Sequence, residues 1–288
     1  MSGPGTPRYT PEWLQLRESA DAAARAPALL GPLRAHLADP PPGRSAAELV
    51  IRDLGCGTGS MGRWLAPRLP GPQHWILHDR DPALLERAGT AMPRTAADGS
   101  RVTVATVCGD LDRLTAHSLA GTSLVTASAL LDVLTHAEVE GLAAACAGAR
   151  CPALLALSVV GRVELTPAED LDAEIADAFN AHQRRGDHPR RMLGPDAVEA
   201  ASEAFARHGA AVRTHASPWR LGAAESALTA QWLPGWVGAA CAQRPDLAPR
   251  AEPYLRARLA ACAAGELRVV VHHSDLLALP PTPGGEPS

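Results

Sequence analysis

An apolar run that leads into three alternating glycines most constrains what this chain can fold into. Residues 49–54 read Leu-Val-Ile-Arg-Asp-Leu, which suits a buried parallel β-strand, and Gly55, Gly57 and Gly59 follow directly. Glycine lets the backbone turn tightly and approach a ligand without a clash at Cβ. The segment therefore predicts a strand followed by a loop that binds a nucleotide cofactor.

Two classes of cofactor fit this loop. Gly57, Gly59 and Gly62 match the dinucleotide pattern G-x-G-x-x-G, and Asp79 follows at about the 20-residue spacing of a ribose-binding acid. A dinucleotide brings an anionic pyrophosphate to such a loop, and the carboxylate of Asp53 at the strand end would repel it. Asp53 would attract an ammonium or sulfonium group instead. The charge favours a cationic ligand, whereas the spacing leaves a nicotinamide or flavin enzyme open.

The fuller pattern Asp53-x-Gly55-x-Gly57-x-Gly59 resembles motif I of the class I S-adenosylmethionine (SAM) methyltransferases of the small-molecule type. The order of the segments that follow is similar to that family too. We expect a helix from Pro82, and further strands at 74–79, 102–111, 123–131, 152–160, 211–217 and 267–273. The resemblance implies a Rossmann-like α/β fold, with an open and mostly parallel sheet, an antiparallel last strand and helices on both faces.

The resemblance also implies positions for the cofactor, which would be SAM. In the family, an acid at the end of the second strand binds the ribose hydroxyls, and an acid after the third strand lies beside the adenine amino group. Asp79 and Asp110 occupy these positions, and Asp81 is the alternative to Asp79. The residues that we expect around the cofactor are Asp53, Gly55, Cys56, Gly57, Gly59, Asp79, Arg80, Asp110, Leu111 and Ser128.

Two candidates for the chemistry follow the fourth strand, where the family commonly places residues near the methyl group. Asp132 or His136 would act as the base for a hydroxyl, an amine or an acidic carbon. Methyl transfer is an in-line displacement that depends mainly on positioning, so no invariant catalytic residue is required. The alternative for Asp132 is a carboxylate that complements a helix dipole, and for His136 a solvated helix residue.

The segments outside the expected sheet indicate three parts of the chain. We expect an N-terminal helical cap at 1–40, with Thr10 as N-cap and a break near Pro27, then a SAM-binding domain at 41–280 and a disordered tail at 281–288.

Helical inserts are expected at about 162–194 and 219–265, near the active site, because the strands before them end at the cofactor edge of the sheet. A capping box at 166–169 would begin the helix of the first insert. The residues that we expect to contact the substrate are Trp13, Arg17, His188, Arg191 and Trp232. The alternatives are Trp13 as a helix anchor with Arg17 solvated, Trp232 in the core of the insert or at a dimer interface, and Arg191 in a solvated loop.

Composition excludes several kinds of function. The chain has no lysine, which excludes a Schiff-base lysine and a Walker-type phosphate loop. The formal net charge is −4 with scattered arginines, so no nucleic-acid partner is expected. The six cysteines lack the spacing of a zinc site or of a disulfide framework, so we expect no metal. The first residues do not show a basic region followed by an apolar run, and no apolar segment reaches about 18 residues, so we expect a cytoplasmic protein with no membrane partner.

The acceptor is expected to be a small molecule. Residues 126–130 read Thr-Ala-Ser-Ala-Leu, not the Asn/Asp-Pro-Pro-Tyr/Phe sequence of enzymes that methylate nucleobase or amide nitrogens. We expect a bacterial enzyme of specialised metabolism, with O-methylation slightly favoured over C- or N-methylation, and a homodimer as one assembly. The alternatives are an NAD(P)-dependent oxidoreductase and a non-catalytic SAM-binding partner protein.

Overall fold

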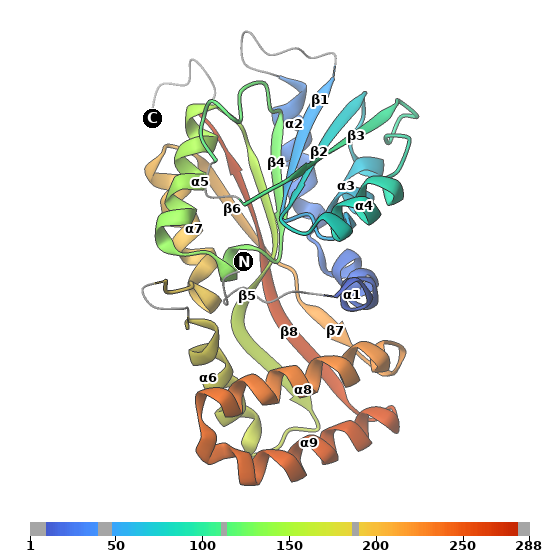
Figure 1. Ribbon diagram of the computed structural model, residues 1–288, viewed down its shortest axis with the longest axis vertical. Helices are drawn as coiled ribbons and strands as arrows, with labels where there is room; N and C mark the ends of the chain where they lie inside the picture. Colours follow the sequence, from blue (N-terminus) through green and yellow to red (C-terminus); the bar gives the residue numbers. More distant parts are fainter. Residues whose placement is uncertain (1–9, 40–47, 111–113, 186–189, 282–288) are drawn as a thin grey trace.

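One mixed sheet forms the centre of the computed structural model, which describes residues 10–39, 48–110, 114–185 and 190–281 (Figure 1). Its strands run in the order β3-β2-β1-β4-β5-β8-β6, and β7 pairs with β8 outside this path. The strands are β1 (Leu49–Leu54), β2 (Gln73–Asp79), β3 (Val102–Cys108), β4 (Leu124–Ser128), β5 (Ala153–Thr166), β6 (Ala211–Ala216), β7 (Trp219–Leu221) and β8 (Arg268–Leu279).

Strand direction follows the expected pattern. Strands β1 to β5 run parallel to one another, and β8 runs antiparallel to β5, β6 and β7. Strand β4 and the first half of β5 are apolar and buried, as parallel strands covered on both faces must be. The strand order and the antiparallel β8 confirm the predicted Rossmann-like fold.

Helices cover both faces of the sheet (Figure 1). One hydrophobic cluster lies under α2, α3 and α4, and a second lies under α5 and α7. The helices are α1 (Pro11–Ala24), α2 (Leu30–Ala38), α3 (Ser60–Leu65), α4 (Pro82–Ala91), α5 (His136–Gly148), α6 (Leu171–Gln183), α7 (Ala197–Arg207), α8 (Ser226–Gln243) and α9 (Ala248–Ala263). None of the helices in the described ranges is long and apolar enough to cross a membrane.

The N-terminal segment forms two helices as expected. The hydroxyl oxygen of Thr10 accepts a hydrogen bond from the backbone N–H of Trp13 at 3.2 Å and so caps α1. The short 3-10 turn η1 (Pro27–Leu29) separates α1 from α2. The tail at 281–288 that was expected to be disordered lies, apart from residue 281, outside the described residues.

A separate lobe extends the sheet beyond its parallel strands. Residues 163–166 of β5 and strand β7 pair with the first half of β8, and α6, α8 and α9 pack around this extension (Figure 1). We call α6, α8, α9 and this part of the sheet the lobe. Both inserts were expected to be helical, but the first begins as the continuation of β5 and the second begins with β7.

The helix predicted from the capping box at 166–169 begins at Leu171 instead. Thr166 is the last residue of β5 and pairs with Arg268, so it is not free to cap a helix. Glu169 forms an ion pair with Arg258 at 3.4 Å, and its backbone N–H donates to Asp172. Pairing in the sheet thus overrides the local helix signal.

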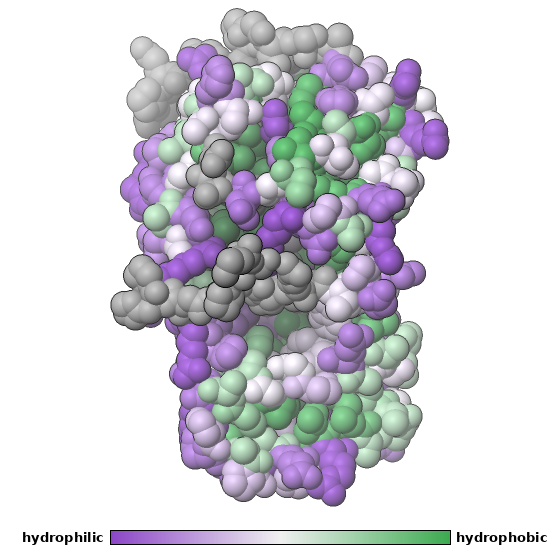
Figure 2. Space-filling view, viewed as in Figure 1, coloured by the Kyte–Doolittle hydropathy of each residue, from purple (hydrophilic) through white to green (hydrophobic). Residues whose placement is uncertain are grey.

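Helix α8 shows how the tryptophans of the second insert are used. Trp236 is buried in the core of the lobe, and Trp232 stacks on it with 5.0 Å between ring centroids. The helix contains no charged residue, and Figure 2 shows pale and green surface over much of the lobe. Both tryptophans therefore pack within the lobe, and the substrate contact expected of Trp232 stays a prediction.

A buried carboxylate joins the N-terminal segment to the sheet. Asp275 in β8 is 2% exposed, and its Oδ2 accepts the backbone N–H of Ala26 at 2.8 Å. Its Oδ1 accepts the backbone N–H of Leu157 at 2.8 Å, where the pairing of β5 with β8 shifts register. Asp275 therefore fixes both the break after α1 and the irregularity in β5.

Replacing Asp275 with alanine should leave two buried backbone N–H groups without acceptors. We expect Asp275→Ala to lower the free energy of unfolding by about 3 kcal/mol, measured by urea denaturation. Asp246→Ala is the control, because Asp246 pairs with Arg244 on the surface, and it should cost less than about 1 kcal/mol. Equal losses in the two variants would contradict this role of Asp275.

Candidate functional site

The glycine loop between β1 and α3 has the backbone that its sequence predicts. Gly55, Gly57 and Gly59 have φ values of 61°, 54° and 86°, a region that favours glycine. A Cβ at Gly57 would lie 3.2 Å from Leu14 of α1, and a Cβ at Gly55 would lie 3.1 Å from Leu130 after β4. Both the conformation and the close neighbours therefore require glycine here.

Asp79 at the end of β2 holds this loop. Its Oδ2 accepts the backbone N–H of Gly57 at 2.9 Å, and its Oδ1 accepts the backbone N–H of Asp81 at 3.0 Å. Asp81 instead caps α4 through a bond from the N–H of Ala83. The geometry favours Asp79 over Asp81 as the acid beside the cofactor loop.

The end of β3 lies next to Asp79. The backbone N–H of Gly109 donates to the carbonyl oxygen of Asp79 at 3.0 Å, which brings Asp110 to the same edge of the sheet. Asp110 and Arg80 are exposed there, and Leu111 lies outside the described residues. Cys56 of the glycine loop is buried, and burial raises the pKa of its thiol, which stays protonated.

Asp53 presents a buried carboxylate with one free oxygen. Its side chain is 1% exposed, and Oδ1 accepts the hydroxyl of Thr126 at 2.7 Å. Oδ2 has no hydrogen-bond partner within the described part of the chain. Burial raises the pKa of Asp53 to about 7, although Thr126 and the charge of Arg25 act in the opposite direction.

Arg25 at the end of α1 was not expected from the sequence. It is 1% exposed, and its Nη2 donates to the hydroxyl oxygens of Ser60 at 3.0 Å and Ser128 at 3.1 Å. Its Nε and Nη1 have no partner among the residues described. Burial lowers the pKa of Arg25, and Asp21, Asp275 and Asp53 oppose that shift by their charge. The only sequence signal was a basic residue just before the break at Pro27.

Helix α1 contacts a different region with each of two faces. Leu14, Glu18 and Arg25 face the glycine loop and β4, and Glu18 binds the guanidinium of Arg63 at 2.6 and 2.7 Å. The other face packs against the lobe, and its residues are Trp13, Leu16, Arg17, Ala20 and Asp21. The spacing of each set matches the helical period, so one helix contacts both regions.

The face toward the lobe carries a cluster centred on Arg17. Its Nε donates to both carboxylate oxygens of Asp21, at 3.0 and 3.2 Å, and its guanidinium lies 4.9 Å from the ring centroid of Trp219. The indole N–H of Trp219 also donates to Asp21, at 2.9 Å, and its ring lies 5.2 Å from that of His273. Asp132 lies within electrostatic reach of Arg17. We call these five residues the Arg17 cluster.

Of the two predicted bases, only Asp132 belongs to this cluster. Its Oδ1 is buried without a partner in the described ranges, and burial raises its pKa. His136 is exposed at the start of α5 and lies within electrostatic reach of Asp196, as does Arg191. The charge of Asp196 is already paired with Arg184 at 2.6 Å.

The other predicted substrate residues do not lie together either. Trp13 is partly buried and packs with Trp232 against the core of the lobe. Arg17 lies between the glycine loop and the lobe, within the cluster described above. His188 lies outside the described residues.

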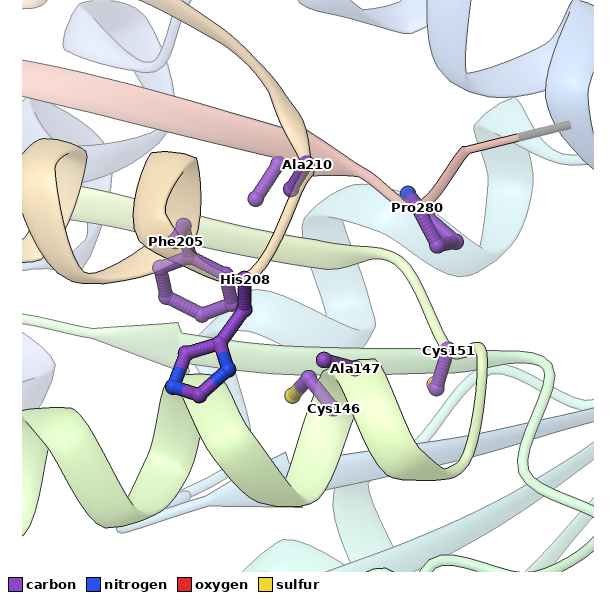
Figure 3. Close-up of a pocket in the computed structure, with 8 residues that line it drawn as sticks. Cys146, Ala147, Cys151, Phe205, His208, Ala210 and Pro280 are labelled. Atoms are coloured by element: carbon purple, nitrogen blue, oxygen red, sulfur yellow. The ribbon is translucent and has the colours of Figure 1, made fainter. Parts of the chain in front are cut away.

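A small apolar cavity lies at the other end of the sheet (Figure 3). It is enclosed by the C-terminal ends of α5 and α7 and by the end of β8, and Cys146, Phe205 and Ala278 line it. Strand β5 begins beside Ala278, so this is the amino edge of the parallel strands, opposite the glycine loop. None of the residues predicted for the site lines the cavity.

Comparison with known proteins identifies part of the chain. Residues 51–151, from within β1 to just beyond α5, match the family model of a methyltransferase domain. This match confirms the predicted class of enzyme and, with it, SAM as the methyl donor. A search of curated proteins gave no match.

Solved structures with a similar fold have low sequence identity to this chain. A cyclopropane synthase from Mycobacterium tuberculosis is 14% identical, with 87% of this chain and 83% of that chain covered and a TM-score of 0.44. A SAM-dependent methyltransferase from Geobacter sulfurreducens, in complex with S-adenosylhomocysteine (SAH), is 16% identical, with 94% and 99% covered and a TM-score of 0.41. A geranyl diphosphate C-methyltransferase from Streptomyces coelicolor A3(2) is 13% identical, with 88% and 75% covered and a TM-score of 0.42. Likenesses at this level do not assign an acceptor.

The raised pKa of Asp53 makes its ionisation unfavourable for folding. The folded protein holds this proton up to about pH 7, whereas the ordinary value of 3.8 applies after unfolding. The stability linked to the proton is therefore complete below about pH 4 and is lost as the pH rises to about 7. Asp53→Asn cannot ionise and should gain stability over the unmodified protein, by about 2 kcal/mol more at pH 8 than at pH 5.

Urea unfolding of both proteins at the two pH values, without ligand, measures this difference. Asp98→Asn is the control, because Asp98 is an exposed carboxylate at the surface turn before β3. A variant at Asp53 that is less stable than the unmodified protein at pH 8 would contradict the assignment.

Proposed function

We propose that this chain, whose residues 51–151 are a methyltransferase domain, transfers the methyl group of SAM to a small organic acceptor, with oxygen favoured as the methylated atom. One observation carries the proposal beyond the domain match. Asp53 and Arg25, a buried carboxyl group and a buried guanidinium beside the glycine loop, have hydrogen-bonding atoms without partners in the described structure.

The free atoms of this pair fit an amino-acid group. Oδ2 of Asp53 can accept from an ammonium, and Nε and Nη1 of Arg25 can donate to a carboxylate. The two side chains lie within electrostatic reach of each other, but no hydrogen bond joins them in the described structure. An α-amino acid carries both charges on one carbon, and SAM ends in such a group. The pyrophosphate of a dinucleotide would meet the carboxylate of Asp53, so the pair supports SAM over NAD(P).

The remaining cofactor contacts follow from the loop and the strand ends. In this proposal the cofactor lies close against the backbone of Gly55, Gly57 and Gly59, and Asp79 binds its ribose hydroxyls. Cys56, Arg80, Asp110 and Leu111 would surround the adenine and ribose, and Ser128 would hold Arg25 in place. Apart from Leu111, which lies outside the described residues, these residues lie at or next to the carboxyl edge of the parallel strands, where open α/β sheets bind their ligands.

Asp132 is the better placed of the two candidate bases. When bound, SAM supplies a methyl group made electrophilic by its sulfonium. Leu130 contacts the glycine loop, and Asp132 follows two residues later with a buried free oxygen. From there Asp132 would take the proton of an acceptor hydroxyl, and α1 and the lobe would keep water out of the site.

The role of Arg25 can be tested with two ligands that differ in the amino-acid group. SAH contains this group, and 5′-methylthioadenosine lacks it. We expect Arg25→Gln to weaken SAH binding by about thirtyfold or more, because a charge-assisted pair is lost, and to leave 5′-methylthioadenosine binding nearly unchanged. Isothermal titration calorimetry measures both affinities.

Arg34→Gln is the matched control, because Arg34 also lies in the N-terminal helices but binds the carbonyl oxygen of Arg68 at the surface. It should change neither affinity. An equal loss for both ligands in Arg25→Gln would contradict the proposed contact. Binding of NADH without binding of SAH by the unmodified protein would overturn the proposed function.

A further inference from the structure

Two more buried polar side chains at the Arg17 cluster have no assigned role. Ser217 is 0% exposed and His273 is 5% exposed, and neither Ser217 Oγ nor His273 Nδ1 has a partner among the described residues. The backbone N–H of Ser217 donates to the carbonyl oxygen of His273 at 2.9 Å, so the two residues are neighbours. Buried polar atoms without partners are costly, and a ligand would satisfy them.

This pair adjoins the cofactor site. The ring of His273 lies against Trp219, whose indole N–H binds Asp21, and Asp21 lies within electrostatic reach of Arg25. The Arg17 guanidinium is in turn within reach of both His273 and Asp132. The free polar atoms of Ser217 and His273 therefore lie beside Trp219 and the Arg17–Asp21 ion pair, and the charge of Arg17 acts on both His273 and Asp132.

The charges of this region disfavour a charged acceptor. Arg17 is already neutralised by its bidentate pair with Asp21. Burial and the nearby charge of Arg17 lower the pKa of His273 to about 3, so its imidazole is neutral at physiological pH. A neutral imidazole and a serine hydroxyl bind an uncharged polar group well, because each can donate or accept.

We propose that Ser217 and His273 bind the acceptor through an uncharged polar group, while a hydroxyl of the same molecule faces Asp132. The acceptor class is a small uncharged compound with two such groups. This inference rests on the proposed function and adds its substrate class.

The transfer step balances with these groups. The hydroxyl proton goes to the carboxylate of Asp132, and a lone pair of the oxygen forms the new bond to the methyl carbon. The bond from that carbon to sulfur breaks, and its electron pair stays on sulfur. The products are a methyl ether, SAH and a protonated Asp132.

The three dihydroxybenzenes are suitable probes, because they place two hydroxyls at three different separations. The three xylenes have similar shapes without polar groups. With the SAH-loaded protein, we expect at least one dihydroxybenzene to bind more tightly than its xylene counterpart, measured by ligand-detected NMR titration. Ser217→Ala and His273→Gln should each weaken that binding by about three- to tenfold.

The neighbouring residues supply matched controls. Ser274→Ala and His272→Gln remove groups that bond to His215 and Glu164 at the surface, and they should leave probe affinity unchanged. Equal binding of xylenes and dihydroxybenzenes, or equal losses in Ser217→Ala and Ser274→Ala, would overturn the inference. The SAH titration separates the two proposals: without SAH binding the proposed function fails, and with it only the acceptor class is at stake. Ser217→Ala removes a single oxygen and keeps the test valid if His273→Gln does not fold.

Discussion

The carboxylate of Asp275 fixes the part of the molecule on which the site depends. It binds the N–H of Ala26 and the N–H of Leu157, which belong to segments far apart in the sequence. Arg25 directly precedes Ala26, so the position of this buried cation depends on an acid from the last strand. A buried carboxylate is costly unless hydrogen bonds and a nearby positive charge compensate it, and Asp275 has both.

The charges around Arg25 explain why a cationic cofactor suits this fold. Asp21 and Asp275 balance Arg17 and Arg25, so the group is close to neutral as long as Asp53 keeps its proton. SAM carries an ammonium, a sulfonium and a carboxylate, and its net positive charge favours the ionised form of Asp53. A pyrophosphate would instead meet the carboxylate of Asp53, and its negative charge would disfavour the ionised form of that group. The preference for a cationic ligand, which the sequence indicated through Asp53 alone, thus follows from the buried charged residues together.

The sequence predicted correctly those features that are encoded by residues close together in the chain. The glycine loop and the end of β2 were predictable, because positive φ values and apolar parallel strands leave marks in neighbouring residues. Arg25, Ser217 and His273 were not, because their roles arise from contacts between segments that are distant in the chain. The capping box at Thr166 failed for the same reason, since pairing with Arg268 decided its conformation. Asp132 and His136 looked equivalent in the sequence, whereas in the structure Oδ1 of Asp132 is buried without a partner among the described residues and His136 is exposed.

Helix α1 turns these separate contacts into one site. Leu14 and Glu18 contact the glycine loop and α3, whereas Asp21 and Arg17 contact Trp219 at the edge of the lobe. A rigid helix that forms a wall of both regions cannot move away from one without disturbing the other. The ion pair of Glu18 with Arg63 and the bond of Asp21 to Trp219 therefore act together on α1. The cofactor site and the proposed acceptor site share this wall, so order in one of them promotes order in the other.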